Sequence, residues 1–584
     1  MNEKEQDLNF KSLFLPFTTK KAIVYIFLIG FIVFFNALFN NFVLDDKTFL
    51  LFNQEIHSFN LNYIFGPSLF NTGYYRPIPV LYFTISYSLF RDSTFFYHFL
   101  QISLHIIISS FLFIFFNKVF NKKMALFLSL IFLVHPMQVD SVSYIASSGN
   151  QLFFLFGILA LLLCAKPTID KARFIAIFSL LLLSLLARET GFLLLFIVLL
   201  YRFTLDKKRR IQLFLLGGSI ISAIYFLLRF AIGHVYLTKF AFVPIARLSL
   251  IERIANIPAI IFYYLKTFFF PLTLMSQQQW IITSLDINHF FVPLLFDIVF
   301  FLLICLLGIY IRRKFIKYFK AYIFFFVWLI IGFFPQIQIF PLDMTVADRW
   351  FYFPIVGLLG LLGLTIQIFN VRSKKVRQIL YALAILIIVI LSTRTIIRNF
   401  NWVNALTLYT HDSKIQTNYE IEDNFGYEYD NLGNYKEALK HYKASVNIYA
   451  EEGNLYNLGS VYAKMGDNQK AIEYYSKTIN SNSIQPRIHE TIMQAVYPRL
   501  ALLLLKTENP QKAKDLIVSA LQRYPKLGTL WVELAISEYS LQDKQNALAF
   551  AKKGELLSQD NLSIYVYTQI SKNLPIDKTN IIFK

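Results

Sequence analysis

The chain contains very little cysteine and very little charge. Of its 584 residues only two are cysteines, and only 16% are Asp, Glu, Lys or Arg. Cys164 and Cys305 both lie inside apolar segments, so the sequence predicts neither a disulfide framework nor a cysteine-based metal site. Residues 1–19 carry mixed charge and lack the pattern of a cleavable signal peptide. We therefore expect the first apolar segment to remain as an anchor.

Apolar residues dominate instead, at 56% of the chain with 63 phenylalanines. Apolar runs of about twenty residues recur, which is typical of a polytopic membrane protein. They are expected near residues 22–38, 97–117, 124–135, 150–165, 174–187, 190–203, 211–231, 293–311, 321–340, 351–370 and 378–396. The run 255–272 is ambiguous and could be a re-entrant helix, an interfacial helix or half of a membrane hairpin. These runs predict an all-α membrane domain of about 11 spans.

The formal charge of +20 does not indicate a nucleic-acid partner. Many of the basic residues lie in short loops between apolar segments, which is how membrane topology is encoded, and these loops should be cytoplasmic. The clusters are Lys20-Lys21, Lys118 with Lys122-Lys123, Lys166 with Lys171 and Arg173, Lys207 to Arg210, Arg312 to Lys314, and Arg372 with Lys374-Lys375. With this orientation the last span exits on the outer side, and everything after it lies outside.

The same topology gathers a second set of ionisable residues at the outer ends of the spans. The set consists of Asp45, Asp46, Arg76, His135, Asp140, Arg188, Glu189, Asp348 and Arg349. Such residues are costly to hold near lipid and are functional candidates by default. Each also has a structural alternative, such as helix capping by His135 or a local ion pair between Arg188 and Glu189. Their segregation to one face favours a site that opens outward.

The composition changes after residue 398, where polar residues increase and a repeat with a period of about 34 residues begins. Its small-residue positions are Ala438, Ala471, Ala513 and Ala547. The pattern resembles the tetratricopeptide repeat, with one longer interval that predicts an insertion around residues 483–491. We therefore predict a membrane domain over 1–398 and a solenoid of about four repeats over 399–584. Such solenoids present concave surfaces to peptides, which makes a polypeptide the expected partner.

Five short motifs follow one another along the membrane part. They are Phe42-Val43-Leu44-Asp45-Asp46, Tyr75-Arg76-Pro77, Val134 to Asp140, Arg188-Glu189-Thr190-Gly191 and Ala347 to Pro354. In this order, and with the terminal repeats, they resemble the transmembrane and tetratricopeptide-repeat O-mannosyltransferases and their bacterial relatives in the glycosyltransferase C superfamily. The resemblance covers nearly the whole chain and implies a membrane domain of the glycosyltransferase C type.

The chain departs from that family pattern at several motif positions. Leu44 stands where the family typically has Trp, and Arg188 where it often has Lys. Asp140 and Asp348 stand where Glu is often found, and Ser147-Ser148-Gly149 where an Arg is common. The swaps between acids and between bases preserve most of the charge in the motifs.

The resemblance implies transfer of a mannose-like sugar from a polyprenyl-phosphate donor to a protein hydroxyl on the outer face. Asp45 would be the base, and Asp46 would orient the acceptor or tune its neighbour. Arginine suits a departing phosphate because its forked donors bind an anion strongly in a low-dielectric site. The residues expected to bind the donor phosphate and substrate are Arg76, His135, Asp140, Arg188, Glu189, Asp348 and Arg349.

No cofactor is expected, although Asp45 and Asp46 could hold a divalent metal instead of serving as a metal-free acid pair. The alternatives are a periplasmic oligosaccharide ligase with a repeat tail and a non-catalytic scaffold anchored in the membrane. A transporter is less favoured, because the sequence shows no inverted symmetry. Richness in Phe, Ile, Lys and Asn indicates an AT-rich bacterial genome. This favours the inner membrane with periplasmic repeats, although an endoplasmic reticulum protein with a lumenal tail would have a similar sequence.

Overall fold

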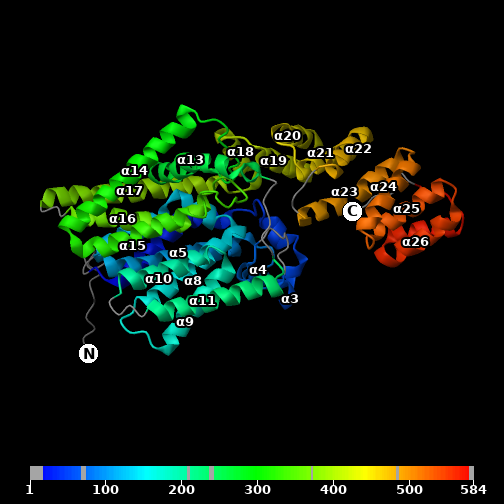
Figure 1. Ribbon diagram of the computed structural model, residues 1–584. Coiled ribbons are helices and arrows are strands. Elements are labelled where there is room, and N and C mark those ends of the chain that lie inside the picture. Colours follow the sequence, from blue (N-terminus) through cyan, green and yellow to red (C-terminus); the bar gives the residue numbers. More distant parts are fainter. Residues whose placement is uncertain are drawn as a thin grey trace, which may run out of the picture. The chain divides into compact units, whose positions relative to one another are not determined.

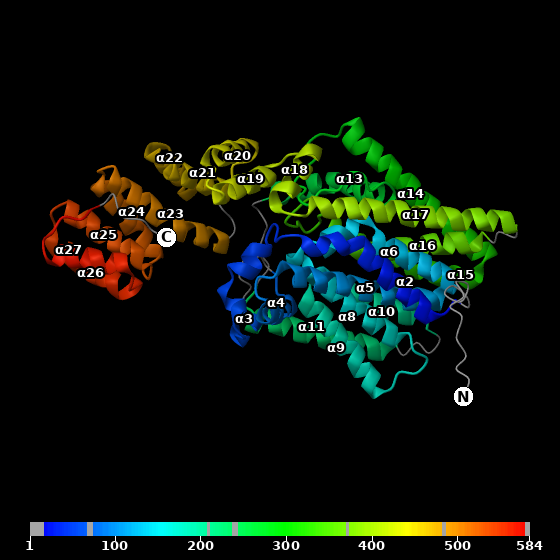
Figure 2. The same cartoon turned by 180° about the vertical axis from the view of Figure 1, so that it is seen from behind.

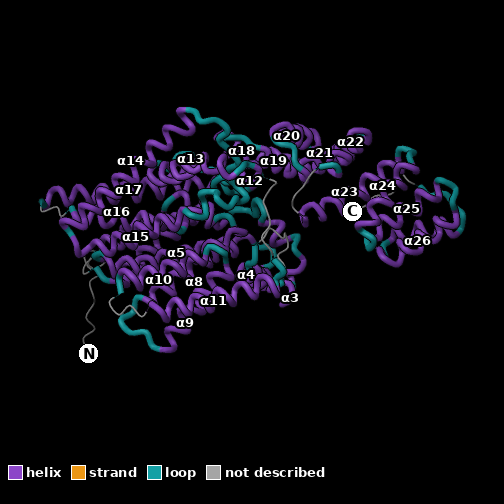
Figure 3. Tube along the Cα trace, in the orientation of Figure 1, coloured by secondary structure: helices purple, strands orange, loops and turns teal. Residues whose placement is uncertain are grey.

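The computed structural model describes residues 17–66, 74–206, 211–235, 243–369, 373–481 and 486–577. Within these ranges every regular element is a helix, and the only β-type pairing is an isolated bridge between Gln278 and Val346. Figure 3 shows this helical composition along the described part of the trace. The predicted all-α class is confirmed. Some residues with sequence-based predictions lie outside the described ranges. They are the basic residues at 207–210 and 372, which are predicted to be cytoplasmic, and most of the segment 1–19.

The chain forms two compact units, one reaching Gln416 and the other beginning at Thr417. The first unit thus extends past residue 398, where we predicted the boundary from the change in composition. The additional residues include α18 (Ala405–Ile415), whose buried Asp412 is bonded to residues of the membrane part. Composition alone does not detect such a contact, because α18 is itself polar.

Long helices that lie side by side make up most of the first unit (Figures 1 and 2). Besides α18, its α-helices are α2 (Thr19–Phe34), α3 (Leu61–Phe65), α4 (Pro77–Phe90), α5 (Thr94–Val119), α6 (Lys122–Val134), α7 (Val139–Val142), α8 (Ser148–Cys164), α9 (Lys171–Ala187), α10 (Gly191–Thr204), α11 (Ile211–Leu227), α12 (Pro244–Arg247), α13 (Leu250–Phe269), α14 (Val292–Lys314), α15 (Ile316–Phe333), α16 (Pro354–Ile368) and α17 (Lys374–Asn401). Short 3-10 or π turns are η1 (Phe35–Phe39), η2 (Lys47–Leu51), η3 (Gln54–His57), η4 (Pro136–Gln138), η5 (Ile145–Ser147), η6 (Leu228–Ile232), η7 (Ile287–Phe291) and η8 (Asp348–Tyr352).

Seven helical segments among the described residues are long and apolar enough to cross a membrane. They are Thr19–Phe39, Thr94–Val119, Ile145–Cys164, Ile211–Ile232, Ile287–Lys314, Ile316–Phe333 and Lys374–Asn401. An eighth arises if α6 and the segment Pro136–Val142, which are bent by 50°, form one broken span. The chain is an integral membrane protein, but the predicted count of about 11 is not confirmed. The runs near 190–203 and 351–370 form the shorter apolar helices α10 and α16.

Two further helices differ from the sequence-based topology or refine it. The apolar helix α4 lies between the runs 22–38 and 97–117, where the sequence predicts no span, and it begins at Pro77 because proline is favoured in a first helical turn. The ambiguous run near 255–272 falls largely in α13. This helix starts with a capping box between Ser249 and Glu252 and carries both charged and apolar residues.

The second unit is a series of antiparallel helix pairs followed by one further helix. Its elements are α19 (Tyr419–Asn431), α20 (Tyr435–Ile448), α21 (Glu452–Lys464), α22 (Asn468–Ile479), α23 (Pro486–Lys506), α24 (Pro510–Arg523), α25 (Gly528–Ser540), α26 (Lys544–Ser558) and α27 (Asn561–Ser571). Gly426 and Gly459 allow close pairing, because a Cβ on either would lie within 2.7 Å of Tyr442 or Tyr475. The predicted insertion lies partly outside the described residues, and the 21-residue length of α23, against 13 for α21, lengthens this repeat.

One buried acid in the solenoid leads to a stability prediction. Glu533 of α25 is fully buried, and neither carboxylate oxygen has a partner among the described residues. Burial raises its pKa well above the usual range. Replacing the unpaired acid by an apolar side chain of similar length, Glu533→Met, should stabilise the second unit by about 1–3 kcal/mol at pH 8. Urea unfolding of the full-length chain, followed by pulse proteolysis, measures the change.

The effect of Glu533→Met should depend on pH in a defined direction. A raised folded-state pKa means that the parent loses stability as the pH rises above the unfolded-state pKa of about 4.3. The gain should therefore be largest at pH 8 and shrink as the pH falls towards that value. Glu490→Met, at an exposed position of α23, is the matched control and should change stability little. Equal stability of Glu533→Met and the parent at pH 8 would contradict the prediction.

Candidate functional site

Asp45 and Asp46 occupy the turn that follows η1, and their environments differ. The preceding residue, Leu44, has a left-handed backbone with φ of 51°. Asp45 is exposed, and its Oδ2 accepts a 2.6 Å hydrogen bond from the Tyr144 hydroxyl. Asp46 is fully buried, and its two carboxylate oxygens accept backbone N–H bonds from Ala146 at 2.6 Å and Val43 at 3.1 Å. Asp45 can therefore reach a substrate, whereas Asp46 ties two loops together.

The protein environment raises the pKa of both carboxyl groups. Burial raises the pKa of Asp46 to about 8, and the charge of Asp45 adds to this against the lowering effect of the backbone donors. Asp45 reaches solvent, yet the dense surrounding protein desolvates it and raises its pKa as well, while the Tyr144 hydroxyl and the charge of Arg349 oppose the rise. Because a charge on Asp45 raises the pKa of Asp46, the two carboxyl groups resist ionising together.

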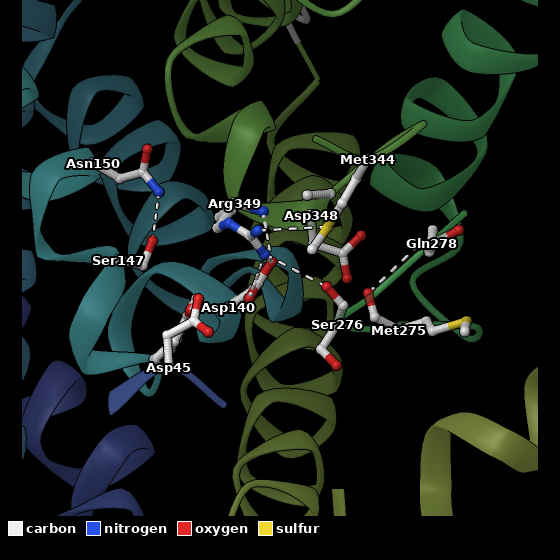
Figure 4. Close-up of polar contacts among 12 residues, drawn as sticks. Asp45, Asp140, Ser147, Asn150, Met275, Ser276, Gln278, Met344, Asp348 and Arg349 are labelled. Carbon is white, nitrogen blue, oxygen red and sulfur yellow. Dashed lines mark hydrogen bonds and ion pairs between the residues drawn. The ribbon is translucent and has the colours of Figure 1, made fainter. Parts of the chain in front are cut away.

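Arg349 and Asp140 form a buried ion pair beside this turn. The Arg349 backbone N–H donates to Asp140 Oδ2 at 3.0 Å, and guanidinium NH1 lies 3.2 Å from the same oxygen. NH1 also donates to the Ser276 carbonyl at 3.4 Å, and NH2 lies 3.6 Å from Met344 Sδ (Figure 4). The guanidinium carbon is 5.5 Å from the Tyr144 ring centroid. Tyr144 thus links Asp45 to Arg349, whose charge is largely balanced by Asp140.

Glu189 is shared by two arginines. Its Oε2 accepts from Arg76 Nε at 2.9 Å, and its Oε1 accepts from the Tyr75 backbone N–H at 2.9 Å. Arg229 of η6 lies 3.5 Å from the same Oε1. Sequence reasoning missed Arg229, although a lone arginine near the outer end of an apolar run was an available signal. A local ion pair between Glu189 and its neighbour Arg188, which the sequence left open as a structural alternative, is not formed.

Arg188 lacks a carboxylate partner within ion-pair distance among the described residues. One of its guanidinium nitrogens, NH1, donates to the side-chain oxygen of the buried Asn150. Desolvation, together with the positive charges of Arg76 and Arg349, lowers its pKa to about 9. The side chain is partly exposed and remains charged at neutral pH. Of the three arginines predicted for the site, Arg188 is the one whose charge is not balanced by a bonded acid.

Asp348 and His135 are held by hydrogen bonds away from free solvent. Asp348 accepts from the Tyr263 hydroxyl, and burial raises its pKa to about 7. His135 Nδ1 accepts from the Met137 N–H at 3.3 Å, so Nε2 donates to the Phe268 carbonyl at 3.0 Å. Both ring nitrogens are therefore used by the backbone. This differs from our prediction that His135 donates to a phosphate, and it agrees with the capping alternative.

The described residues contain no group of three His, Cys, Asp or Glu side chains that could hold a metal ion. At the acid pair, both oxygens of Asp46 are already occupied by backbone N–H groups, which leaves Asp45 as a single free carboxylate. The chemistry available from this geometry is therefore proton abstraction by an exposed carboxylate and anion binding by an unbalanced arginine.

Comparisons with known proteins agree with the resemblance found in the sequence. The human protein O-mannosyl-transferase TMTC3 is 23% identical over 91% of this chain, and its mouse counterpart is 23% identical over 99%. The Caenorhabditis elegans protein O-mannosyl-transferase F38B6.6 is 26% identical over 64%. The predicted resemblance is confirmed. The aligned regions cover 67%, 65% and 54% of these relatives, so the chain matches only part of their length.

The second unit and the fold give further matches. The tetratricopeptide repeat family model matches residues 423–452 and 453–483, which confirms the predicted repeat type there. Among solved structures, ArnT from Cupriavidus metallidurans bound to undecaprenyl phosphate aligns with a TM-score of 0.36 and 12% identity. That alignment covers 79% of this chain and 81% of ArnT.

Proposed function

We propose that this chain is a membrane glycosyltransferase that moves a mannose-like sugar from a polyprenyl-phosphate donor to a protein hydroxyl. One observation carries the proposal. An exposed carboxylate, Asp45, and an arginine without a bonded acid, Arg188, both lie within electrostatic reach of Arg349. A base for the acceptor and an uncompensated cation for the leaving phosphate are the two groups that this reaction needs. The ordered motifs and the names of the relatives support the same reaction.

In the proposed reaction Asp45 removes the proton from the acceptor hydroxyl. The acceptor oxygen forms a bond to the anomeric carbon while the bond from that carbon to the phosphate oxygen breaks, so the configuration inverts. The electron pair leaves with the lipid phosphate, which needs no proton from a general acid. Arg188 binds this phosphate, and the hydrogen bonds from its guanidinium group become stronger as negative charge develops on the phosphate.

The neighbouring residues have supporting roles in this scheme. Glu189 holds Arg76, and Asp140 holds Arg349, so both guanidinium groups keep fixed positions in the site. Asp46 fixes the turn that carries Asp45. His135 takes no part in phosphate binding, since both of its ring nitrogens are bonded to the backbone. We propose that the reaction uses no metal or cofactor.

The repeats give the proposed acceptor and compartment. A tetratricopeptide solenoid presents its concave surface to peptides, and we propose that it binds the acceptor polypeptide. We propose that the end of α17 lies on the outer side of the membrane, which is the orientation that the basic loops predict. The richness in Phe, Ile, Lys and Asn indicates an AT-rich bacterial genome. We therefore propose that the chain lies in a bacterial inner membrane, with the repeats in the periplasm.

Sugar transfer from a panel of radiolabelled polyprenyl-phosphate monosaccharides tests the function. In membranes that contain the full chain, label should reach protein, and the mannose donor should give the largest signal. Membranes without the chain provide the background. Absence of protein label with every donor would overturn the proposal. Transfer of a preassembled oligosaccharide would favour a ligase, and binding of a polypeptide without any transfer would favour a scaffold.

A further inference from the structure

Asp412 of α18 is a fully buried acid whose oxygens are all used by donors from other segments. Its Oδ2 accepts from the Ser276 backbone N–H at 2.7 Å and from the Ser276 hydroxyl at 2.6 Å. Its Oδ1 accepts from Arg398 NH1 of α17 at 3.2 Å and contacts His411 Nδ1 at 2.9 Å. Asp412 therefore joins α17, α18 and the segment around Ser276 at one buried point.

Asp412 is held in its charged form. Burial opposes ionisation, but Arg398, His411 and the two Ser276 donors outweigh burial and keep the pKa below the usual range. A buried carboxylate that satisfies several donors cannot be removed without leaving them unpaired. The position of Ser276 therefore depends on this one side chain.

Ser276 in turn contacts the candidate site. Its carbonyl oxygen accepts from Arg349 NH1 at 3.4 Å, and that nitrogen also binds Asp140 at 3.2 Å. Ser276 is fully buried and lies beside Arg349 and Asp140 (Figure 4). Two oxygens from different segments thus fix one nitrogen of Arg349, and Asp412 determines where one of those segments lies.

We propose that Asp412 is a positioning residue for sugar transfer and acts on the reaction through Ser276 and Arg349. This inference rests on the proposed transferase function. Replacing Asp412 by Asn keeps the shape of the side chain but turns one acceptor oxygen into a donor. If the amide NH2 faces Arg398 and His411, the negative charge that holds Arg398 is lost, although Ser276 keeps its acceptor oxygen. If the NH2 faces Ser276, it meets two donors, and the Ser276 segment loses its fixed place. The Arg349 guanidinium then loses its second anchor while Asp140 remains.

Transfer kinetics of full-length variants test the proposal. Asp412→Asn should lower kcat roughly tenfold, because small displacements of a charge-stabilising group reduce the rate of the chemical step. The KM for the donor should change less. Ser276→Ala removes the hydroxyl but keeps the backbone N–H and carbonyl, so it should have a smaller effect in the same direction. Asp170→Asn is the matched control, because Asn caps α9 as well as Asp does.

A double-mutant cycle separates positioning from a general loss of structure. If Asp412 acts through Arg349, adding Asp412→Asn to Arg349→Ala should cause almost no further loss, whereas independent effects multiply. Hydrogen exchange gives a readout without activity: Asp412→Asn should speed exchange of residues 274–280 and of η8, while Asp170→Asn should not. The proposal would be overturned if the rate losses of Asp412→Asn and Arg349→Ala multiply in the double variant, or if hydrogen exchange in η8 is unchanged by Asp412→Asn. If the parent transfers no sugar, the proposed function fails, and the exchange result alone decides the link.

Discussion

Asp45→Asn is expected to lower the rate of sugar transfer by about 10³-fold while leaving the amount of folded protein unchanged. Asn cannot take the acceptor proton, but its side-chain oxygen can still accept the hydrogen bond from Tyr144 that Asp45 Oδ2 accepts. Asp45 is also exposed, so its replacement opens no cavity. Initial rates with the best donor of the radiolabelled panel, normalised to folded protein in membranes, measure the change.

The pH profile gives a second signature of Asp45. Surrounding protein raises the pKa of this carboxyl group, and a base works only when it is ionised. The parent should therefore lose activity as the pH falls through a value above the ordinary aspartate pKa of about 3.9. The residual activity of Asp45→Asn should lack this acidic limb. A variant with parental rate and an unchanged limb would show that another group is the base.

Asp46→Asn provides the informative contrast. Both Asp46 oxygens accept backbone N–H bonds in a fully buried site, so an amide NH₂ there would face a donor and remain unsatisfied. We expect this variant to accumulate less folded protein, with activity lost in proportion. Asp170→Asn, at the exposed cap of α9, controls for expression in both experiments.

The structure places several of the predicted site residues close together, but their pairing could not be read from the sequence. The predicted topology places the charged residues outside the basic loops at the outer ends of the spans. In the structure, Asp45, Asp140 and Arg349 lie around Tyr144. Topology could not distinguish Asp45 from Asp46, since the two are neighbours in the chain. Their difference arises from backbone donors at Val43 and Ala146, and hydrogen bonds to the backbone leave no trace in side-chain identity.

Pairing across the chain was the part that could not be predicted. Glu189 pairs with Arg76 and Arg229 rather than with its neighbour Arg188, because the fold brings segments together that are more than thirty residues apart in the chain. The contact of His135 could not be predicted for the same reason, since its partner Phe268 belongs to α13, which is distant in the chain. The predicted span count is not confirmed for a related reason. Hydropathy finds apolar runs such as 351–370, but only the folded chain shows that α16 ends at Ile368 and starts at Pro354.

Arg188→Gln is expected to lower kcat/KM for the donor by about 10²-fold, because it removes the proposed phosphate ligand. Arg76 and Arg349 are bonded to Glu189 and Asp140, whereas Arg188 bonds to the neutral Asn150. Desolvation and the charges of Arg76 and Arg349 lower the Arg188 pKa in the free protein, and a bound phosphate would offset the repulsion among the three arginines. Arg188→Lys keeps the charge but loses the fork, so it should fall between Arg188→Gln and the parent.

Binding of undecaprenyl phosphate separates phosphate recognition from other effects of Arg188. Its affinity for the full chain in lipid nanodiscs should fall in Arg188→Gln and recover partly in Arg188→Lys. Arg173→Gln, which changes an exposed arginine near the other end of α9, should bind like the parent. If Arg188→Gln keeps both parental affinity and parental kcat/KM, the leaving phosphate must be bound elsewhere. Arg349 would then be the stronger candidate, because it also contacts Tyr144, the partner of Asp45.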